Sequence, residues 1–236
     1  MTQTKSKVIG KSTPLIHSWD KVTGAAKFTD DLKIQNPLII KIMRSPFASA
    51  NIKNINFKEA QKLKGVKGLI IGTDLPNTFG VLPISKDEPA MAIDRVRYVG
   101  EPVLAIAAES EEIANEAISL VEIEYEITEA VVKTKDAFKK TNNPIHPERK
   151  KENNLHKNVL QHFGDIDRGM EESEIVIEED FHFPSINHGF TEPHATQVEI
   201  DGQDNITIHS ATQVPHYLHR ALSMVLEIPM HRIRAR

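Results

Sequence analysis

The amino-acid sequence predicts an α+β protein, chiefly from one strand–helix–strand run in its first half. Residues 103–107 are uniformly apolar, as in a buried strand. Residues 109–120 carry apolar side chains at helical spacing and begin with glutamates, which suit the N-terminal end of a helix. Residues 121–127 alternate between apolar and acidic side chains, the pattern of a strand with one buried face. Together these elements imply an α+β domain.

Three further elements precede this run. Residues 38–43 are apolar and rich in isoleucine, which predicts a strand. Residues 57–63 predict a short helix that ends before Gly65, and residues 66–71 predict a second strand that ends at Gly72. Helices and strands thus alternate along the first half of the chain.

The C-terminal part predicts short strands and helices around one amphipathic helix. The expected elements are a helical turn over residues 165–170, a strand over 174–183, strands over 197–200 and 205–209 around an Asp201-Gly202 turn, and a helix over 215–226. In the last helix, Leu218, Leu222 and Val225 form an apolar stripe behind a proline in the first turn. The sequence ends inside the next expected strand, so we expect this unit to be incomplete.

These patterns divide the chain into four segments: an N-terminal arm over residues 1–20, a domain over 21–132, a linker over 133–158 and a second domain over 159–236. The linker carries eight lysines and arginines against three acidic residues. It could be a basic patch for an anionic partner or a solvated segment that wraps over the surface. Phe138 is its one aromatic residue, which favours the solvated segment.

Composition excludes several classes of protein. The net charge of −4 indicates neither a nucleic-acid partner nor a membrane surface. The chain has no cysteine, so it has no disulfide, no thiolate nucleophile and no thiolate ligand for an iron–sulfur cluster. It also has no signal peptide and no apolar run long enough to span a bilayer. We therefore expect a cytoplasmic protein.

No self-contained active site is visible in the residue spacing. Seven of the eleven histidines follow residue 180, and His216 and His219 are three residues apart on the predicted helix. A zinc site there lacks cysteines and a His-Glu-x-x-His pattern, so ordinary surface and core histidines are the better interpretation. Nucleophile-elbow, dinucleotide-binding and Walker patterns are absent, and residues 164–169 lack the ligands of a calcium loop. We predict no catalytic residue and no metal ligand in this chain.

Three sets of motifs nevertheless follow one another in a specific order. They are Asp20-Lys-Val-Thr-Gly-Ala-Ala-Lys-Phe-Thr-Asp-Asp31 with Arg44-Ser-Pro-Phe-Ala-Ser-Ala50; Phe79-Gly-Val-Leu-Pro83 with Arg95-Val-Arg-Tyr-Val-Gly-Glu-Pro-Val103; and Gly164-Asp-Ile-Asp167, Glu192-Pro193, Thr212-Gln-Val-Pro215 and Ile233-Arg234. In this order they resemble the molybdopterin-binding large subunits of the xanthine dehydrogenase and aldehyde oxidase family. The resemblance covers nearly the whole chain.

The resemblance implies a particular pair of domains. Residues 21–132 are expected to form the α/β hammerhead domain, and residues 159–236 the start of the molybdopterin-binding domain. Phe47 and Ser49 stand where the family usually has histidines, so any role of those imidazoles is lost here. Residues 79–83 and 212–219 are most similar to the 4-hydroxybenzoyl-CoA reductase branch.

One residue is implied to contact the molybdenum cofactor. In the family, the glutamine of the Thr-Gln motif donates a hydrogen bond to an oxygen ligand of molybdenum, and Gln213 is the matching residue. An amide at the end of a strand can instead satisfy the backbone of a loop. The family resemblance favours the cofactor-binding role for Gln213.

The resemblance also implies an oxidoreductase that acts on a small aromatic, heterocyclic or aldehyde substrate. Electrons would pass to [2Fe–2S] clusters and FAD on an iron–sulfur subunit and an FAD subunit. The family's general-base glutamate and glycine-rich cofactor loop are not in this sequence, so we expect the chain to be inactive alone. A second hypothesis is a non-catalytic hammerhead module that binds partner subunits. A downstream coding sequence for the glycine-rich loop would favour the enzyme.

Overall fold

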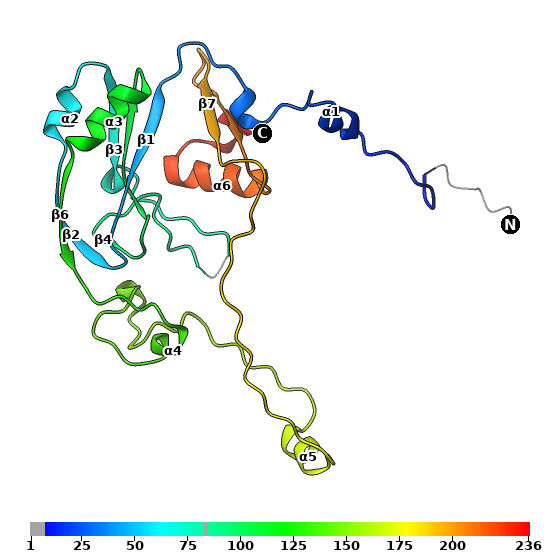
Figure 1. Ribbon diagram of the computed structural model, residues 1–236. Coiled ribbons are helices and arrows are strands. Elements are labelled where there is room, and N and C mark those ends of the chain that lie inside the picture. The colour runs from blue at the N-terminus through cyan, green and yellow to red at the C-terminus, as the bar shows by residue number, and fades with distance from the viewer. Residues whose placement is uncertain (1–7, 83–84) are drawn as a thin grey trace. The chain divides into compact units, whose positions relative to one another are not determined.

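The computed structural model describes residues 8–82 and 85–236, and these form two compact units (Figure 1). One unit consists of Leu38–Thr78 and Asp87–Gly189. The other consists of the described parts of Met1–Pro37 and Phe79–Lys86 together with Phe190–Arg236. Pro83, the last residue of one family motif, lies outside the described residues, as do residues 1–7 of the predicted arm. The mixture of helices and sheets confirms the predicted α+β class.

The first sheet has strand order β1-β5-β3, with every neighbouring pair antiparallel. Its strands are β1 (Ile39–Arg44), β5 (Pro102–Ala108) and β3 (Val66–Ile71). Helix α3 (Glu111–Ser119) begins at Ser110, whose Oγ accepts a hydrogen bond from the backbone N–H of Ile113 at 3.3 Å. Helix α2 (Lys58–Lys62) precedes Gly65, which has a φ of 96°. The predicted elements over 38–43, 57–63, 66–71, 103–107 and 109–120 are therefore confirmed.

The core under this sheet is apolar and continuous. Leu104 and Ile106 of β5 are fully buried and pack with Ala60, Ala117 and Val121. Strand β5 lies between two partners, and most of its side chains are buried on both faces. This is why the sequence of the central strand is uniformly apolar, whereas the edge strands β1 and β3 alternate between more and less exposed side chains.

The second sheet of this unit has strand order β4-β2-β6. Strand β6 (Glu122–Ile127) confirms the predicted alternating strand, but β2 (Ala50–Asn56) and β4 (Arg95–Val96) were not predicted. Asparagines are disfavoured in strands, which hides β2 from its sequence. The structure explains two of them: Asn51 and Asn56 donate hydrogen bonds to Glu126 and Glu122 of β6, at 2.9 and 3.2 Å.

The linker folds against the same unit. It contains the short helix α4 (Thr134–Ala137) and the 3₁₀ turn η3 (Pro147–Arg149). Arg149 forms an ion pair with Asp87, and the guanidinium of Arg95 donates to the carbonyl of Pro144 at 3.0 Å. The linker is therefore held by specific polar contacts, although most of it lacks regular secondary structure.

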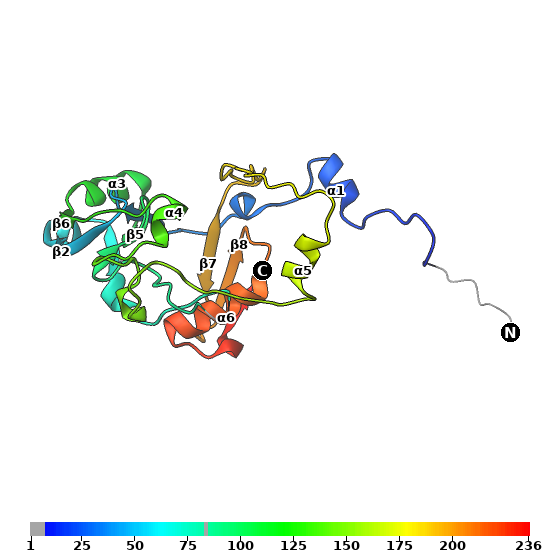
Figure 2. The same cartoon turned by 90° about the horizontal axis from the view of Figure 1, so that it is seen from below.

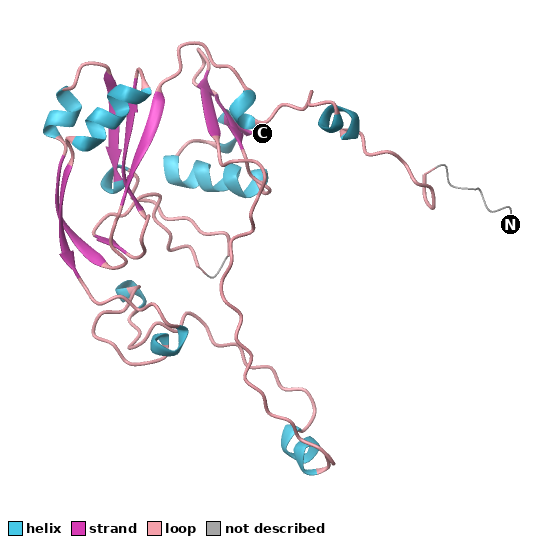
Figure 3. Ribbon diagram, in the orientation of Figure 1, coloured by secondary structure: helices cyan, strands magenta, loops and turns pink. Residues whose placement is uncertain are grey.

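One predicted element, the strand over residues 174–183, is wrong. Helix α5 (Ile166–Glu171) forms as expected and is capped by Asp165, but residues 174–183 are extended and form no strand (Figure 3). All of their side chains are exposed, Ile175 and Phe181 among them. The sequence pattern favours a strand, but no described strand pairs with this segment, and a strand needs a neighbour to satisfy its backbone.

The other unit contains a sheet of order β7-β8-β9 covered by one helix (Figure 2). Strands β7 (Thr196–Ile200) and β8 (Ile206–Ser210) are antiparallel, and β9 (Ile233–Ala235) pairs with β8 in parallel. Helix α6 (Pro215–Leu226) and the turn η4 (Met230–Arg232) form the crossover between β8 and β9. The predicted elements over 197–200, 205–209 and 215–226 are thus confirmed.

The core and the turn of this unit can be traced to single residues. Leu218 and Leu222 of α6 pack on the buried Ile206, Ile208 and Ile233. The β7–β8 turn is longer than the two residues predicted, because Asp201 Oδ1 accepts hydrogen bonds from the backbone N–H groups of residues 203 and 205. Short helices α1 (Ser18–Val22) and η1 (Thr29–Asp31) precede the sheet in the sequence. None of the described helices is long and apolar enough to cross a membrane.

Candidate cofactor-binding site

Gln213 lies in the tight turn between β8 and α6. Thr212, which precedes Gln213, closes the turn. The backbone N–H of Val214 donates to Thr212 Oγ1 at 3.2 Å, and the N–H of Thr212 donates to the carbonyl of Ser210 at 2.8 Å. Proline at position 215 then starts α6 with its φ already suited to a helix. The sequence Thr-Gln-Val-Pro therefore fixes the backbone at Gln213 from both sides.

The side chain of Gln213 takes no part in the hydrogen bonds that close this turn. The residue is exposed, and within the described residues no group accepts a hydrogen bond from its amide. Thr212 performs the loop-stabilising role that the sequence left open for Gln213. The amide is thus a donor and an acceptor, held on a short turn between two regular elements and available to a ligand.

The turn suits an acceptor-rich cofactor in two ways. The Gln213 amide can donate to an oxygen or a ring nitrogen without adding charge. In the first turn of the adjoining helix α6, Pro215 has no N–H, and the N–H groups of Tyr217 and Leu218 donate to the carbonyl of Val214, so the N–H of His216 alone has no acceptor among the described residues. These donors fit a pterin with polar substituents and a metal-bound oxygen ligand better than they fit a bare cation.

The Glu192-Pro193 motif has a structural contact within the same unit. Glu192 Oε1 accepts a hydrogen bond from the backbone N–H of Thr29 at 3.4 Å, and the amide of Gln197 donates to the carbonyl of Leu32 at 2.9 Å. Residues from the first and third sets of motifs, more than 160 positions apart, are therefore brought together. These contacts link β7 and the segment before it to residues 29–32.

The histidines predicted to be ordinary residues show no convergence on a metal. His219 Nε2 contacts the carbonyl of Met230 at 2.8 Å, which links α6 to η4. Its neighbour at i−3, His216, is exposed and is not part of any group of three possible ligands among the described residues. His219 thus stabilises the crossover between α6 and η4.

The sequence did not indicate a polar cluster that forms elsewhere, between Asp87, His146 and Glu148. His146 Nδ1 lies 2.7 Å from Glu148 Oε1 and 3.5 Å from Asp87 Oδ2, and Arg149 pairs with Asp87 from the other side. Although burial opposes the shift, hydrogen bonds from its own backbone and from His146 lower the pKa of Glu148. Because Asp87 is 59 positions from His146 in the sequence, spacing could not reveal the cluster.

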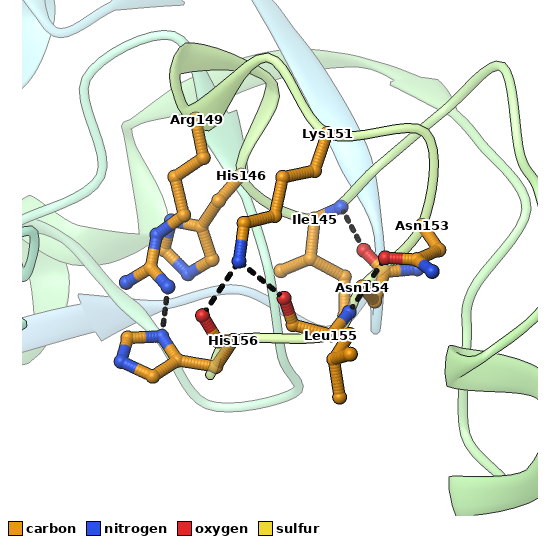
Figure 4. Close-up of a pocket in the computed structure, with 8 residues that line it drawn as sticks. All are labelled: Ile145, His146, Arg149, Lys151, Asn153, Asn154, Leu155 and His156. Atoms are coloured by element: carbon orange, nitrogen blue, oxygen red, sulfur yellow. Dashed lines mark hydrogen bonds between the residues drawn. The ribbon is translucent and has the colours of Figure 1, made fainter. Parts of the chain in front are cut away.

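A small cavity of about 70 Å³ adjoins this cluster, and its basic side chains are paired internally (Figure 4). Lys151 Nζ donates to the carbonyls of Leu155 and His156, at 2.9 and 2.7 Å. Arg149 contacts His156 Nδ1 as well as Asp87. These basic groups fold the linker onto itself, which supports the interpretation of a wrapping segment over that of a patch for an anionic partner.

Comparison with known protein families matches both parts of the chain. Residues 23–129 match "Aldehyde oxidase and xanthine dehydrogenase, a/b hammerhead domain", and residues 145–236 match "Molybdopterin cofactor-binding domain". The chain belongs to the aldehyde oxidase and xanthine dehydrogenase family. The predicted family and the predicted pair of domain types are confirmed, and Gln213 lies within the part that matches the cofactor-binding domain.

Individual relatives agree with this assignment. The chain is 29% identical to "Nicotinate dehydrogenase large molybdopterin subunit" of Eubacterium barkeri, over 97% of its own length and 53% of that protein. It is 31% identical to a probable xanthine dehydrogenase subunit of Bacillus subtilis, over 91% of its own length and 28% of that protein. Among solved structures, it matches quinoline 2-oxidoreductase from Pseudomonas putida 86 with a TM-score of 0.83 and 25% identity, over 98% of its length and 30% of that chain.

The extent of these matches limits what they assign. The chain spans about half of the nicotinate dehydrogenase subunit and about a third or less of the other two relatives. The exact domain boundaries, the hydroxybenzoyl-CoA reductase branch and the cofactor-binding role of Gln213 stay predictions.

Proposed function

We propose that this chain contributes the hammerhead domain and the first part of the molybdopterin-binding domain to the large subunit of a molybdenum hydroxylase. The complete enzyme would oxidise or reduce a small aromatic, heterocyclic or aldehyde substrate in the cytoplasm. The observation that carries the proposal is the exposed, unpartnered amide of Gln213, on a rigid strand-to-helix turn inside the part that matches the molybdopterin cofactor-binding domain.

Gln213 orients the cofactor and does not transfer protons. A primary amide does not titrate near neutral pH, so it can donate a hydrogen bond without changing the charge of the site. Strand β8 and helix α6 fix its backbone, which restricts where the amide can donate. The molybdenum cofactor, when bound, supplies the redox centre at which substrate and electrons are exchanged.

The remaining parts of the electron-transfer chain belong to partners. This chain has no cysteine, so the ligands of an iron–sulfur cluster must come from another polypeptide or from another part of the subunit. We propose an iron–sulfur subunit carrying [2Fe–2S] clusters and an FAD subunit. Names such as "Xanthine dehydrogenase molybdenum-binding subunit", from a relative 27% identical to this chain, support such an organisation.

The test compares variants of the full-length large subunit assembled with its partners. Gln213→Ala should leave the molybdenum content unchanged and lower the metal-normalised turnover by about 10- to 100-fold, the usual effect of losing a group that orients a metal's ligands. Gln203→Ala, in the exposed β7–β8 turn, is the matched control and should keep the parental rate. Parental turnover by Gln213→Ala would show that the amide has no cofactor role. An assembled enzyme without molybdenum would refute the proposed function itself.

A further inference from the structure

Two arginines line a cavity of about 230 Å³ in the unit that contains the two antiparallel sheets. Arg95 is the first residue of β4, and Arg97 follows the strand directly. Side chains two positions apart on an extended chain point to the same side, which brings both guanidinium groups to one wall. Arg95 is only 6% exposed, and the side chain of Arg97 is 14% exposed.

Neither arginine has its hydrogen-bonding capacity met. Arg95 donates to the carbonyl of Pro144 at 3.0 Å, and to Ser49 Oγ and Asn143 Oδ1 at 3.4 Å, all of them neutral acceptors. Arg97 donates to the carbonyl of Arg95 at 3.4 Å. The Nε atoms of both are buried, and within the described residues they have no hydrogen-bond partner. Buried donors of this kind are costly unless a partner arrives.

The electrostatics of the cavity favour an anion. Burial, followed by the neighbouring positive charge of Arg97, lowers the pKa of Arg95. Carboxylates of Asp94, Glu148 and Glu101 counter this effect, but none of them forms an ion pair with Arg95 in the described structure. The closest carboxylate to Arg97 is Glu101, whose Oε1 lies 4.0 Å from the guanidinium. An anion in the cavity would give the terminal N–H groups of the two guanidinium groups a charged acceptor.

Most of the other residues that line the cavity are apolar, and several of them are exposed. Val132 is 82% exposed and Val99 65% exposed, and Tyr98 lies beside them. Glu129 is the one acidic residue of the lining and is exposed, so it repels a second negative charge. This lining disfavours a dianion such as phosphate and leaves room for an apolar group.

We propose that this cavity binds a small organic monocarboxylate. Its carboxylate would pair with Arg95 and Arg97, and its apolar part would lie against Tyr98, Val99 and Val132. A planar guanidinium can present two parallel N–H groups to the two oxygens of a carboxylate. The proposal does not rest on the molybdenum hydroxylase function.

The test is calorimetric titration of the 236-residue chain at constant ionic strength with benzoate, with its neutral analogue benzamide, and with inorganic phosphate. Benzoate should bind saturably and more tightly than either of the other two. Arg97→Gln should weaken benzoate binding by about 10-fold or more, the effect expected from one charged hydrogen bond. Arg168→Gln removes the same charge from the exposed helix α5, outside the cavity, and should change the affinity less than two-fold, within about 0.4 kcal/mol.

A second variant keeps the proposal testable if Arg97→Gln does not fold. Val132→Asp places a negative charge, the same sign as that of benzoate, at the rim of the cavity and should therefore also weaken benzoate binding. Val132 is highly exposed, so no loss of stability is expected. Thermal unfolding of each variant checks the fold. The proposal is overturned if benzoate does not bind, if Arg97→Gln and Val132→Asp bind it as the parent does, or if phosphate or benzamide binds as tightly as benzoate.

Discussion

Replacing Gly72 by alanine should measurably destabilise the unit formed by Leu38–Thr78 and Asp87–Gly189. Gly72 starts the turn η2 (Gly72–Asp74) directly after β3, where a Cβ would lie 2.3 Å from the carbonyl oxygen of Ala92 and 2.8 Å from that of Met91. The first distance is about 1 Å shorter than the 3.4 Å at which ordinary contact begins. Both obstacles are buried backbone, and the N–H of Ala92 is already bonded to the carbonyl of Pro102 at 2.8 Å.

The backbone must therefore move, and the hydrogen bond between residues 92 and 102 must lengthen or break. Overpacking of this kind costs about 1–3 kcal/mol, which corresponds to a fall in Tm of about 3–10 °C for a domain of this size. Gly68→Ala on the same strand is the matched control, because a Cβ there meets nothing within 4 Å. Calorimetric or circular-dichroism melting of the two variants decides the matter. Equal Tm values for Gly72→Ala and the parent would refute the reasoning, as would an equal loss in Gly68→Ala.

Three further outcomes follow from the structure. The purified 236-residue chain, expressed in a host that makes the cofactor, should contain no stoichiometric molybdenum by elemental analysis. Hydrogen exchange should be slow in β5 and fast over residues 172–195, and equal protection of both segments would show that residues 174–183 do pair with a neighbouring strand. Burial raises the pKa of Glu101, so the folded state holds its proton more tightly than the unfolded state, and stability should fall as pH rises from the ordinary glutamate pKa to the raised value. Urea unfolding between about pH 4 and 7 should show stability falling more, or rising less, with pH in the parent than in Glu101→Gln.

Local periodicity was sufficient to predict most of the regular elements. Helix α3 and strands β3 and β5 could be predicted from their own sequences, because their apolar residues follow the pattern of a helix or a buried strand. The family motifs predicted the domain types, which the comparisons confirmed. They also singled out Gln213, and the structure adds that Thr212 closes the turn and leaves the amide unused.

Features that depend on distant partners could not be predicted. Strand β2 has three asparagines, and it becomes a strand because β6 supplies carboxylate acceptors on the facing edge. The unmet donors of Arg95 and Arg97 were equally hidden, since both residues appear in the sequence only as part of a family motif. Burial and hydrogen-bond partners are properties of the folded chain, not of residue spacing.

Two strand-like sequence patterns have different outcomes in this chain. Residues 121–127 alternate and form β6, because β2 supplies a neighbouring strand and a buried face. Residues 174–183 place Ile175, Ile177, Phe181 and Phe183 at even spacing and stay extended and exposed, because no described strand pairs with them. An alternating sequence therefore specifies which face will be buried but not what will bury it.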